Sequence, residues 1–532
     1  MQTKDVLYYF NSGLSYAKEY QNEKAIESFN KAIEINPNYP QIYYNLANTY
    51  NEINQYDFAI ENYKKAAELD PTMCLAFNNL GITYAKKEQY DLAIESFKKA
   101  IEINPDFITA YNSLGITYYK QKHYELSIDV YKKAIELNPD YFEAYKNLGV
   151  SYLEIDCTKA IEYSKKALLL NNNSKEVYNN LAIAYYKERA FDFAIENYHK
   201  ALKLDPNFVE VYSNLSALHL IKGEFEKGWE LYECRFSKEG SRKIKIPELS
   251  QPRWNGESLE NKTIYVYKEQ GFGDTIMFSR YIPLLKNIAQ KVIFRPQPQL
   301  KDLFEINFSE VEILNDSISD ENIQFDTHIP LLSLPLMLKT DLNNIPSTEG
   351  YLKADSDKIN FYKEKIATSH PTGAPRNAGS GSFKIGIFWY GDHRFVPEKS
   401  TDLSYFYRLA ELPNIKLYSL QKGYGNEQLK NKPENIDIVD LGSSFNDYSD
   451  TAAAIANLDL VITIDTSVAH IAGAMNKPAW VLLHTENEWR WMVDREDTPW
   501  YKSIKLFRQK EKDNWQEVFD RVCNELKSHI FI

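Results

Sequence analysis

A repeat with a period of 34 residues dominates the first 235 residues of the chain. A small residue recurs at intervals of 34 or 33 positions, at Gly13, Ala47, Gly81, Gly115, Gly149, Ala182 and Ser216. Prolines close five of the units, at Pro37, Pro71, Pro105, Pro139 and Pro206. A fixed period of this length is typical of helical solenoids, because each pair of helices must bury its apolar face against the next pair. The small residue lets two helices cross closely, so we expect one continuous core along the stack.

The third unit shows the common framework most completely, with Phe77, Leu80, Gly81, Tyr84, Ala93, Phe97, Ala100 and Pro105. This framework resembles the tetratricopeptide repeat. The resemblance implies an all-α solenoid over residues 1–235, with six full repeats and a partial capping repeat. Two units depart from the pattern: the fifth is one residue short near residues 156–157, and the seventh has Gly228 where alanine is usual.

Asparagines recur in the first helix of most units, and such a solenoid typically holds an extended peptide in its inner groove. The candidates for this groove are Asn45, Asn79, Asn112, Asn147, Asn180 and Asn214. Their amides either hydrogen-bond a peptide backbone or bond neighbouring helices. The sequence leaves both interpretations open.

The second half of the chain alternates strand and helix patterns, after a polar connector at residues 236–260. We expect one α/β domain over 261–353, a linker or hinge at 354–383, a second α/β domain over 384–510 and a C-terminal helix over 511–532. Alternating strands and helices predict parallel sheets with both faces covered, and ligands of such folds bind in a cleft at the strand ends. Residues 371–382 are rich in Gly, Ser, Pro and Ala, and are either a native loop or an engineered linker.

Composition narrows the choice of partners. The net charge of −12, from 62 basic and 74 acidic residues, argues against nucleic acid or an anionic membrane as the main partner. The four cysteines lie far apart without a CxxC pair, which fits a reducing compartment and no metal site. The chain begins without the basic and apolar regions of a signal peptide, and no apolar run approaches 18 residues, so we expect a cytoplasmic protein without a membrane span.

Residues 459–484 read as strand, sharp turn, helix and strand. Asp465, Thr466 and Ser467 are small polar residues that suit the start of a helix, where free N–H groups attract anions. His470 follows one turn later, on the side that a bound phosphate would face. The plain alternative is an ordinary helix cap with a surface histidine.

Three further segments are expected at the same cleft. Gly271 and Gly273 precede Asp274 in a strand-to-helix turn that lacks the third glycine of a dinucleotide fingerprint, so Asp274 is either a helix cap or a general base. Lys399 follows the first strand of the second sheet. Gln421 and Lys422 end the next strand. Lysines, hydroxyls, a histidine and a helix N-terminus on neighbouring strand ends would form a diphosphate cradle without a metal.

From about residue 250 to 530 the chain resembles a GT-B glycosyltransferase. It is similar to the heptosyltransferase-like family (glycosyltransferase family 9-like) and to bacterial proteins that fuse tetratricopeptide repeats to such a domain. The segments that carry the resemblance are EQGFGDTIMFSRYIPLL and DTSVAHIAGAMNKPAWVLL. It implies a fold of two Rossmann-like domains facing a cleft. Asp274 would be the catalytic base, with Gln270, Gly271 and Gly273 on the acceptor side. The residues that would hold the donor nucleotide-sugar are Lys399, Gln421, Lys422, Asp465, Thr466, Ser467 and His470.

The function that this resemblance implies is transfer of a sugar from a nucleotide-sugar to a protein held by the repeat array. The reaction would be inverting and metal-independent, without a cofactor, and a flagellin or another surface protein would be the acceptor. Two alternatives stay open. One is a non-catalytic repeat scaffold with a degenerate nucleotide-binding domain, and the other is a transferase that acts on a lipid-linked saccharide.

Overall fold

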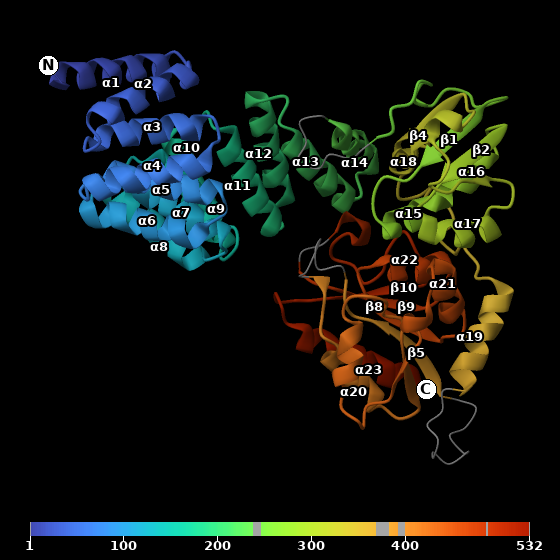
Figure 1. The fold of residues 1–532 in the computed structure, drawn as a ribbon. Coiled ribbons are helices and arrows are strands. Elements are labelled where there is room, and N and C mark those ends of the chain that lie inside the picture. Colours follow the sequence, from blue (N-terminus) through green and yellow to red (C-terminus); the bar gives the residue numbers. More distant parts are fainter. Residues whose placement is uncertain (1, 238–245, 369–381, 392–398, 486–487, 531–532) are drawn as a thin grey trace. The chain divides into compact units, whose positions relative to one another are not determined.

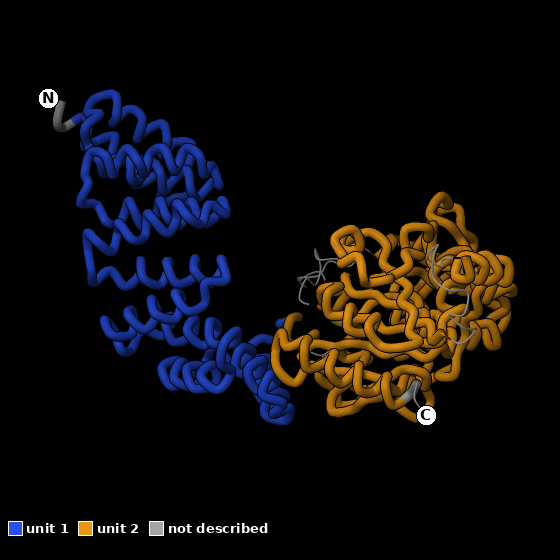
Figure 2. Tube along the Cα trace, turned by 90° about the horizontal axis from the view of Figure 1, so that it is seen from below, with its two compact units in different colours: residues 1–208 blue, residues 209–532 orange. Residues whose placement is uncertain are grey.

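The computed structural model describes residues 2–237, 246–368, 382–391, 399–485 and 488–530. The chain forms two compact units, residues 1–208 and 209–532 (Figure 2). Most of the predicted loop or linker at 371–382, and the segment between Gly391 and Lys399, lie outside the described residues. Among the described helices, none combines the length and the apolar content needed to cross a bilayer.

The first unit is an all-helical solenoid of six helix pairs over its described residues, which confirms the predicted repeat architecture. Its helices are α1 Gln2–Lys18, α2 Asn22–Ile35, α3 Pro40–Glu52, α4 Tyr56–Leu69, α5 Cys74–Lys86, α6 Tyr90–Ile103, α7 Ile108–Lys120, α8 Tyr124–Leu137, α9 Phe142–Tyr152, α10 Cys157–Leu170, α11 Lys175–Lys187 and α12 Phe191–Leu204. A seventh pair, α13 Val209–Lys222 and α14 Phe225–Tyr232, belongs to the second unit.

In the first, third and fourth repeats the small residue is needed because an aromatic ring fills the space beside it. A Cβ atom added at Gly81 would lie 2.7 Å from the Phe97 ring, and one added at Gly115 would lie 2.5 Å from the Tyr131 ring. Contacts this short are not tolerated, so the two helices of a repeat can approach only where this side chain is absent or minimal.

The turn between the two helices of most repeats contains one residue in the left-handed conformation. Its φ lies between 58° and 62° at Tyr20, Asn54, Glu88, Lys122 and Arg189. Non-glycine residues pay roughly 1–2 kcal/mol for this conformation, so the packing of the helices must impose it. In the fifth repeat, which the structure describes completely, no residue from α9 to α10 has a positive φ. The missing residue of that repeat therefore falls in this turn.

The second unit contains two fully parallel sheets, which confirms the prediction of parallel sheets (Figure 1). Their strand orders are β3-β2-β1-β4 and β10-β9-β8-β5-β6-β7. The strands are β1 Thr263–Tyr267, β2 Lys291–Arg295, β3 Glu312–Ile313, β4 Thr327–Pro330, β5 Phe383–Phe388, β6 Ile415–Ser419, β7 Ile438–Asp440, β8 Leu460–Ile464, β9 Ala479–Leu483 and β10 Ile504–Arg508.

Helices flank both sheets (Figure 1). They are α15 Phe272–Phe278, α16 Ile282–Lys286, α17 Lys301–Asn307, α18 Leu334–Met337, α19 Ser356–Thr368, α20 Tyr407–Ala410, α21 Tyr448–Ala456, α22 Ser467–Ala474 and α23 Trp515–Ile530. A helical sequence pattern runs over residues 275–289, but the chain does not form one helix there. The chain forms α15, a 3-10 turn over Ser279–Tyr281 and then α16, because Pro283 has no N–H to continue the helical ladder.

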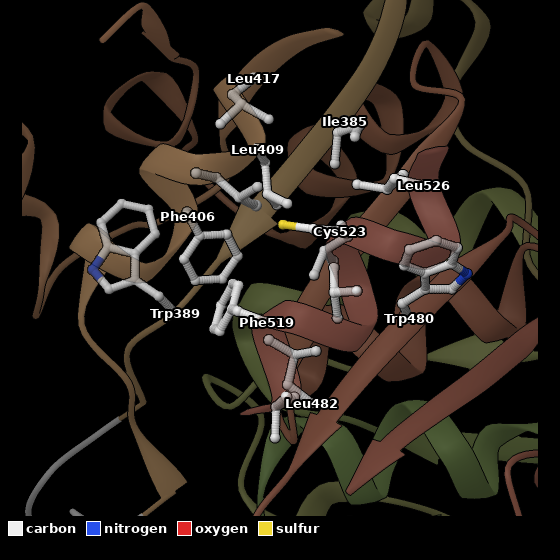
Figure 3. Close-up of a cluster of buried hydrophobic side chains, with 14 of the residues drawn as sticks. Ile385, Trp389, Phe406, Leu409, Leu417, Trp480, Leu482, Phe519, Cys523 and Leu526 are labelled. Carbon is white, nitrogen blue, oxygen red and sulfur yellow. The ribbon is translucent and has the colours of Figure 1, made fainter. Parts of the chain in front are cut away.

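The core of the larger sheet lies between its strands and the helices that cover them (Figure 3). Ile385 of β5 and Leu417 of β6 pack in one cluster with Phe519 and Leu526 of α23, and all four are fully buried. Helix α19, in the predicted linker, packs against α21, and Lys358 of α19 pairs with Asp450 of α21 at 3.0 Å. This part of the linker is therefore a structural element of the second sheet.

Candidate functional site

The turn between β8 and α22 lies at the carboxyl end of a central strand of the larger sheet. Thr466 occupies the N-cap position of α22 with an extended backbone, and its side chain makes no capping hydrogen bond. Its hydroxyl lies 3.2 Å from that of Thr463, and the Ser467 hydroxyl lies 3.1 Å from that of Tyr448. The first N–H groups of α22 therefore have no side-chain cap from Thr466.

Five charged side chains form a continuous row beside this turn, which we call the ion chain: Asp465, Lys399, Glu488, Arg490 and Asp274. The Lys399 Nζ atom donates to Asp465 Oδ2 at 2.7 Å and to Glu488 Oε1 at 2.9 Å. The Arg490 Nη1 atom donates to Glu488 Oε2 at 2.9 Å, and its Nη2 atom donates to Asp274 Oδ1. The row thus joins residues predicted separately, and it links the turn after β1 to the turn after β8.

Burial and pairing fix the charges of the ion chain. Burial alone would lower the pKa of Lys399, but the carboxylates of Asp465 and Glu488 outweigh it and raise that pKa above its ordinary value. Burial would raise the pKa of Asp465, and Lys399 outweighs it and lowers that pKa. Both groups are therefore ionised at neutral pH.

Asp274 uses both carboxylate oxygens within the protein. Its Oδ2 atom accepts a hydrogen bond from the Gly271 N–H at 3.2 Å, as a residue of the first turn of α15. Its Oδ1 atom accepts from Arg490. The helix-capping role predicted as one alternative is present. Both carboxylate oxygens of Asp274 are therefore engaged within the protein while these contacts hold.

His470 is buried, and the predicted alternative of a surface histidine is wrong. Its ring is 3% exposed and stacks on Trp491 with 5.3 Å between centroids. Its Nδ1 atom lies 3.0 Å from the Tyr501 hydroxyl. Burial lowers the pKa of His470 to about 3, so the ring is neutral at physiological pH. Gly273 of α15 packs directly on it, since an added Cβ atom there would lie 2.8 Å from His470 Cδ2.

Gln421 and Lys422 bond to the backbone. The Gln421 amide oxygen accepts from the N–H groups of Trp389 and Tyr390, and its nitrogen donates to the carbonyls of Tyr390 and Tyr424. The buried amide thus bonds to four backbone groups and shapes the turn after β5. The predicted contact between Gln421 and a ligand stays a prediction. Lys422 donates to the Phe445 and Asn446 carbonyls, at 2.5 and 3.0 Å.

A cavity of about 390 Å³ opens beside the same strand ends. Aromatic rings form much of its wall, with Phe272, Phe388, Phe445 and Tyr448 among the lining residues. Lys422 and Ser467 add polar groups. The combination of flat apolar walls and a helix start suits a ligand with an aromatic base and an anionic group.

Gln270, which was predicted on the acceptor side, hydrogen-bonds to residues of the protein itself. The Gln270 amide donates to the Tyr232 hydroxyl at 3.0 Å, and the Gln270 carbonyl accepts from Gln297 at 2.7 Å. The site residues that sequence reasoning missed are Glu488 and Arg490. The signal for Arg490 was the segment WRWMVDRED, which follows Glu488 directly and whose first arginine lies between two tryptophans. The sequence does not show which carboxylates that arginine meets.

The seventh helix pair contributes an aromatic cluster to the second unit. Trp229 of α14 lies 5.3 Å from Trp489 and 6.0 Å from Phe278, measured between ring centroids. Phe225 stacks on Trp500 at 5.5 Å. Trp489 precedes Arg490 directly, so this helix pair supports the segment that carries the ion chain.

Several of the predicted groove asparagines bond within the solenoid. Asn79 donates to Tyr44 and Asn48, each at 3.1 Å, and Asn147 donates to Asn112 at 2.9 Å. Asn45 donates to a carbonyl of its own helix. Of the two interpretations, bonding between neighbouring helices holds for Asn79, Asn112 and Asn147. The roles of Asn180 and Asn214 stay predictions.

Across the described ranges, no group of three or more His, Cys, Asp and Glu side chains is arranged to hold a metal ion.

Comparison with known proteins identifies the repeats. Family models described as "TPR repeat" match residues 13–53, 83–122 and 117–156, and "Tetratricopeptide repeat" matches 40–73 and 176–208. The curated relative "Protein FlbA" of Caulobacter vibrioides is 25% identical over 336 residues, which cover 58% of this chain and 53% of FlbA. The chain thus spans about half the length of that relative.

Solved structures with similar repeats cover about a third of the chain. YrrB, described as a TPR protein with an unusual peptide-binding site, is 26% identical, with a TM-score of 0.31, and covers 35% of this chain and 96% of its own. The MamA protein is 28% identical, with a TM-score of 0.30, and covers 32% and 94%. On the strength of the family matches, residues 13–208 carry tetratricopeptide repeats, which typically bind protein or peptide partners.

Proposed function

We propose that the second unit is a GT-B glycosyltransferase and that the repeat array binds its protein acceptor. The observation that supports this most is the ion chain, in which Glu488 and Arg490 connect Asp274 to Lys399 and Asp465 at the carboxyl ends of the parallel strands. Ligands of open α/β folds bind at this edge. Asp274, Lys399 and Asp465 come from distant parts of the sequence, so their connection is independent of the motifs that suggested them.

The donor nucleotide-sugar would lie with its base in the aromatic cavity and its diphosphate at the start of α22. Thr466 and Ser467 supply the helix start, and Lys399 supplies a positive charge. These groups are in place before the reaction, so they would stabilise the nucleotide as negative charge develops on it, without a metal ion.

Asp274 would take the proton from the acceptor hydroxyl as the sugar is transferred. To do this it must release Arg490, because that guanidinium occupies the Asp274 Oδ1 atom. The repeats would hold the acceptor polypeptide during this step, as tetratricopeptide repeats typically bind peptides.

A protein-binding scaffold without catalysis is the second candidate, and the same ion chain supports it. Both cations of the chain are paired with carboxylates, Asp274 is held at both oxygens, and His470 is buried. Such a unit could bind a nucleotide without turning it over.

Turnover separates the two candidates. The full chain is incubated with UDP-, GDP-, CMP- and ADP-sugars, and nucleotide release is followed. Asp274→Asn should lower the turnover number by about 100-fold or more, while calorimetry should still detect nucleotide binding. Asp302→Asn is the matched control, since Asp302 also lies in the first turn of a helix, α17. Absence of turnover with every donor, or full turnover in Asp274→Asn, would exclude the proposed mechanism.

A further inference from the structure

Glu488 is held in the way that proteins hold an oxyanion. Each oxygen of its carboxylate accepts from a different cation, Lys399 at 2.9 Å and Arg490 at 2.9 Å. Two charged donors converging on one anionic group are the usual recognition element for carboxylates and phosphates. The two cations thus already form an anion-binding pair, and a side chain of the protein occupies it.

The Glu488 side chain has no other structural role in the described part of the chain. It lies at the N-cap of the 3-10 turn Trp489–Trp491 but makes no capping hydrogen bond. Within the part of the chain that the structure describes, its carboxylate contacts only Lys399 and Arg490. It is also the most exposed member of the ion chain, at 36% of its side chain, against 12–17% for the other four.

If Glu488 left its place, the positive and negative charges that remain in the ion chain would balance. Lys399 would keep Asp465, and Arg490 would keep Asp274, so each cation retains one carboxylate. With Glu488 present, three carboxylates face two cations. The departure of Glu488 would therefore leave two cations and two carboxylates, paired one to one.

We propose that Lys399 and Arg490 bind the diphosphate of the donor and that Glu488 occupies their site until that anion displaces it. The nature of the anion rests on the proposed function. Arg490 then contacts both the ligand and Asp274, so arrival of the anion weakens the pairing that occupies the Asp274 Oδ1 atom. Glu488 thereby lowers the affinity of the site for the anion, because the ligand must compete with the Glu488 carboxylate for the two cations.

The test measures binding of inorganic pyrophosphate to the full chain by calorimetry, in EDTA and at low salt, where such contacts are least screened. Glu488→Gln removes the competing charge but keeps the size and shape of the side chain, so we expect it to bind pyrophosphate about tenfold more tightly than the unaltered chain. Lys399→Gln should bind it at least about tenfold more weakly, because one of the two cations is lost.

Glu517→Gln is the matched control, since Glu517 pairs with Arg521 at 2.7 Å on α23 and is 28% exposed. It makes the same change in net charge and should leave pyrophosphate affinity unchanged. Equal or weaker binding in Glu488→Gln, an equal gain in Glu517→Gln, or no binding by any folded variant would overturn the inference.

The outcomes also separate this inference from the proposed function. Tighter pyrophosphate binding in Glu488→Gln, without turnover of any nucleotide-sugar, would support the displaced carboxylate and refute the transferase. Sugar transfer by a chain whose Glu488→Gln variant gains no affinity would refute the displaced carboxylate alone.

Discussion

Gly273→Ala tests the contact that brings the two sheets of the second unit together. The added Cβ atom would lie 2.8 Å from His470 Cδ2, whereas ordinary contacts begin near 3.4 Å. The imidazole must therefore move by about half an ångström or more. It has little room to do so, because it stacks on Trp491 and its Nδ1 atom bonds the Tyr501 hydroxyl.

Two opposing terms set the size of the effect. Overfilling a packed site typically costs about 1–3 kcal/mol. Alanine is favoured over glycine within a helix by up to about 1 kcal/mol, and Gly273 has no positive φ that would penalise alanine. We therefore expect a net loss of about 1–2 kcal/mol in the second unit, which corresponds to a melting temperature lower by roughly 2–4 °C.

Tryptophan fluorescence reports this loss selectively. All eight tryptophans lie in residues 209–532, so their unfolding transition follows the second unit alone. The decisive comparison is a double-mutant cycle with His470→Ala, which removes the ring. In that background Gly273→Ala should be neutral or stabilising. An equal loss with and without the ring, or no loss in either, would refute the packing argument.

The remaining predictions concern the pH dependence of stability and the boundary between the two units. The pKa of His470 is about 3 in the folded state and about 6.5 in the unfolded state, so between these pH values only the unfolded state binds the extra proton. The free energy of unfolding therefore falls by up to about 1.4 kcal/mol for each pH unit that the pH is lowered. His470→Gln should show a shallower slope between pH 6.5 and 5 in tryptophan-detected unfolding, and an unchanged slope would contradict the buried neutral ring. Removal of residues 1–208 should preserve the tryptophan-detected unfolding transition and the proposed donor hydrolysis but abolish protein modification. Removal of residues 1–235 should also destroy the unfolding transition. Identical melting of the two truncated chains would count against the role of α13 and α14.

The parts of the fold predicted best are those fixed by local pattern. Strands β2, β6, β8 and β9 can each be recognised in the sequence, because buried parallel strands are short apolar runs bounded by polar turns. Strand β10 was not predicted. It lies at the edge of the sheet, where Lys505 and Arg508 interrupt the apolar run.

The sequence predicted only the part of the site that lies within one continuous segment. The turn at Asp465–Ser467 could be found from the sequence, because a strand, small polar residues and a helix follow one another. The partners of that turn could not. Arg490 meets Asp274 across 216 positions, and His470 is buried because Gly273 and Trp491 cover it. Such contacts depend on how the two sheets pack, and no local pattern specifies that.

The placement of α13 and α14 changes what the last repeat does. The sequence assigns these helices to the solenoid by period, yet Trp229 and Phe225 pack on Trp489, Phe278 and Trp500 of the second unit. The Tyr232 hydroxyl extends this support, since it accepts a hydrogen bond from Gln270, four residues before Asp274. The seventh pair therefore holds both ends of the Asp274–Arg490 contact. An acceptor or partner that strains this helix pair would act directly on the residues proposed to carry the chemistry.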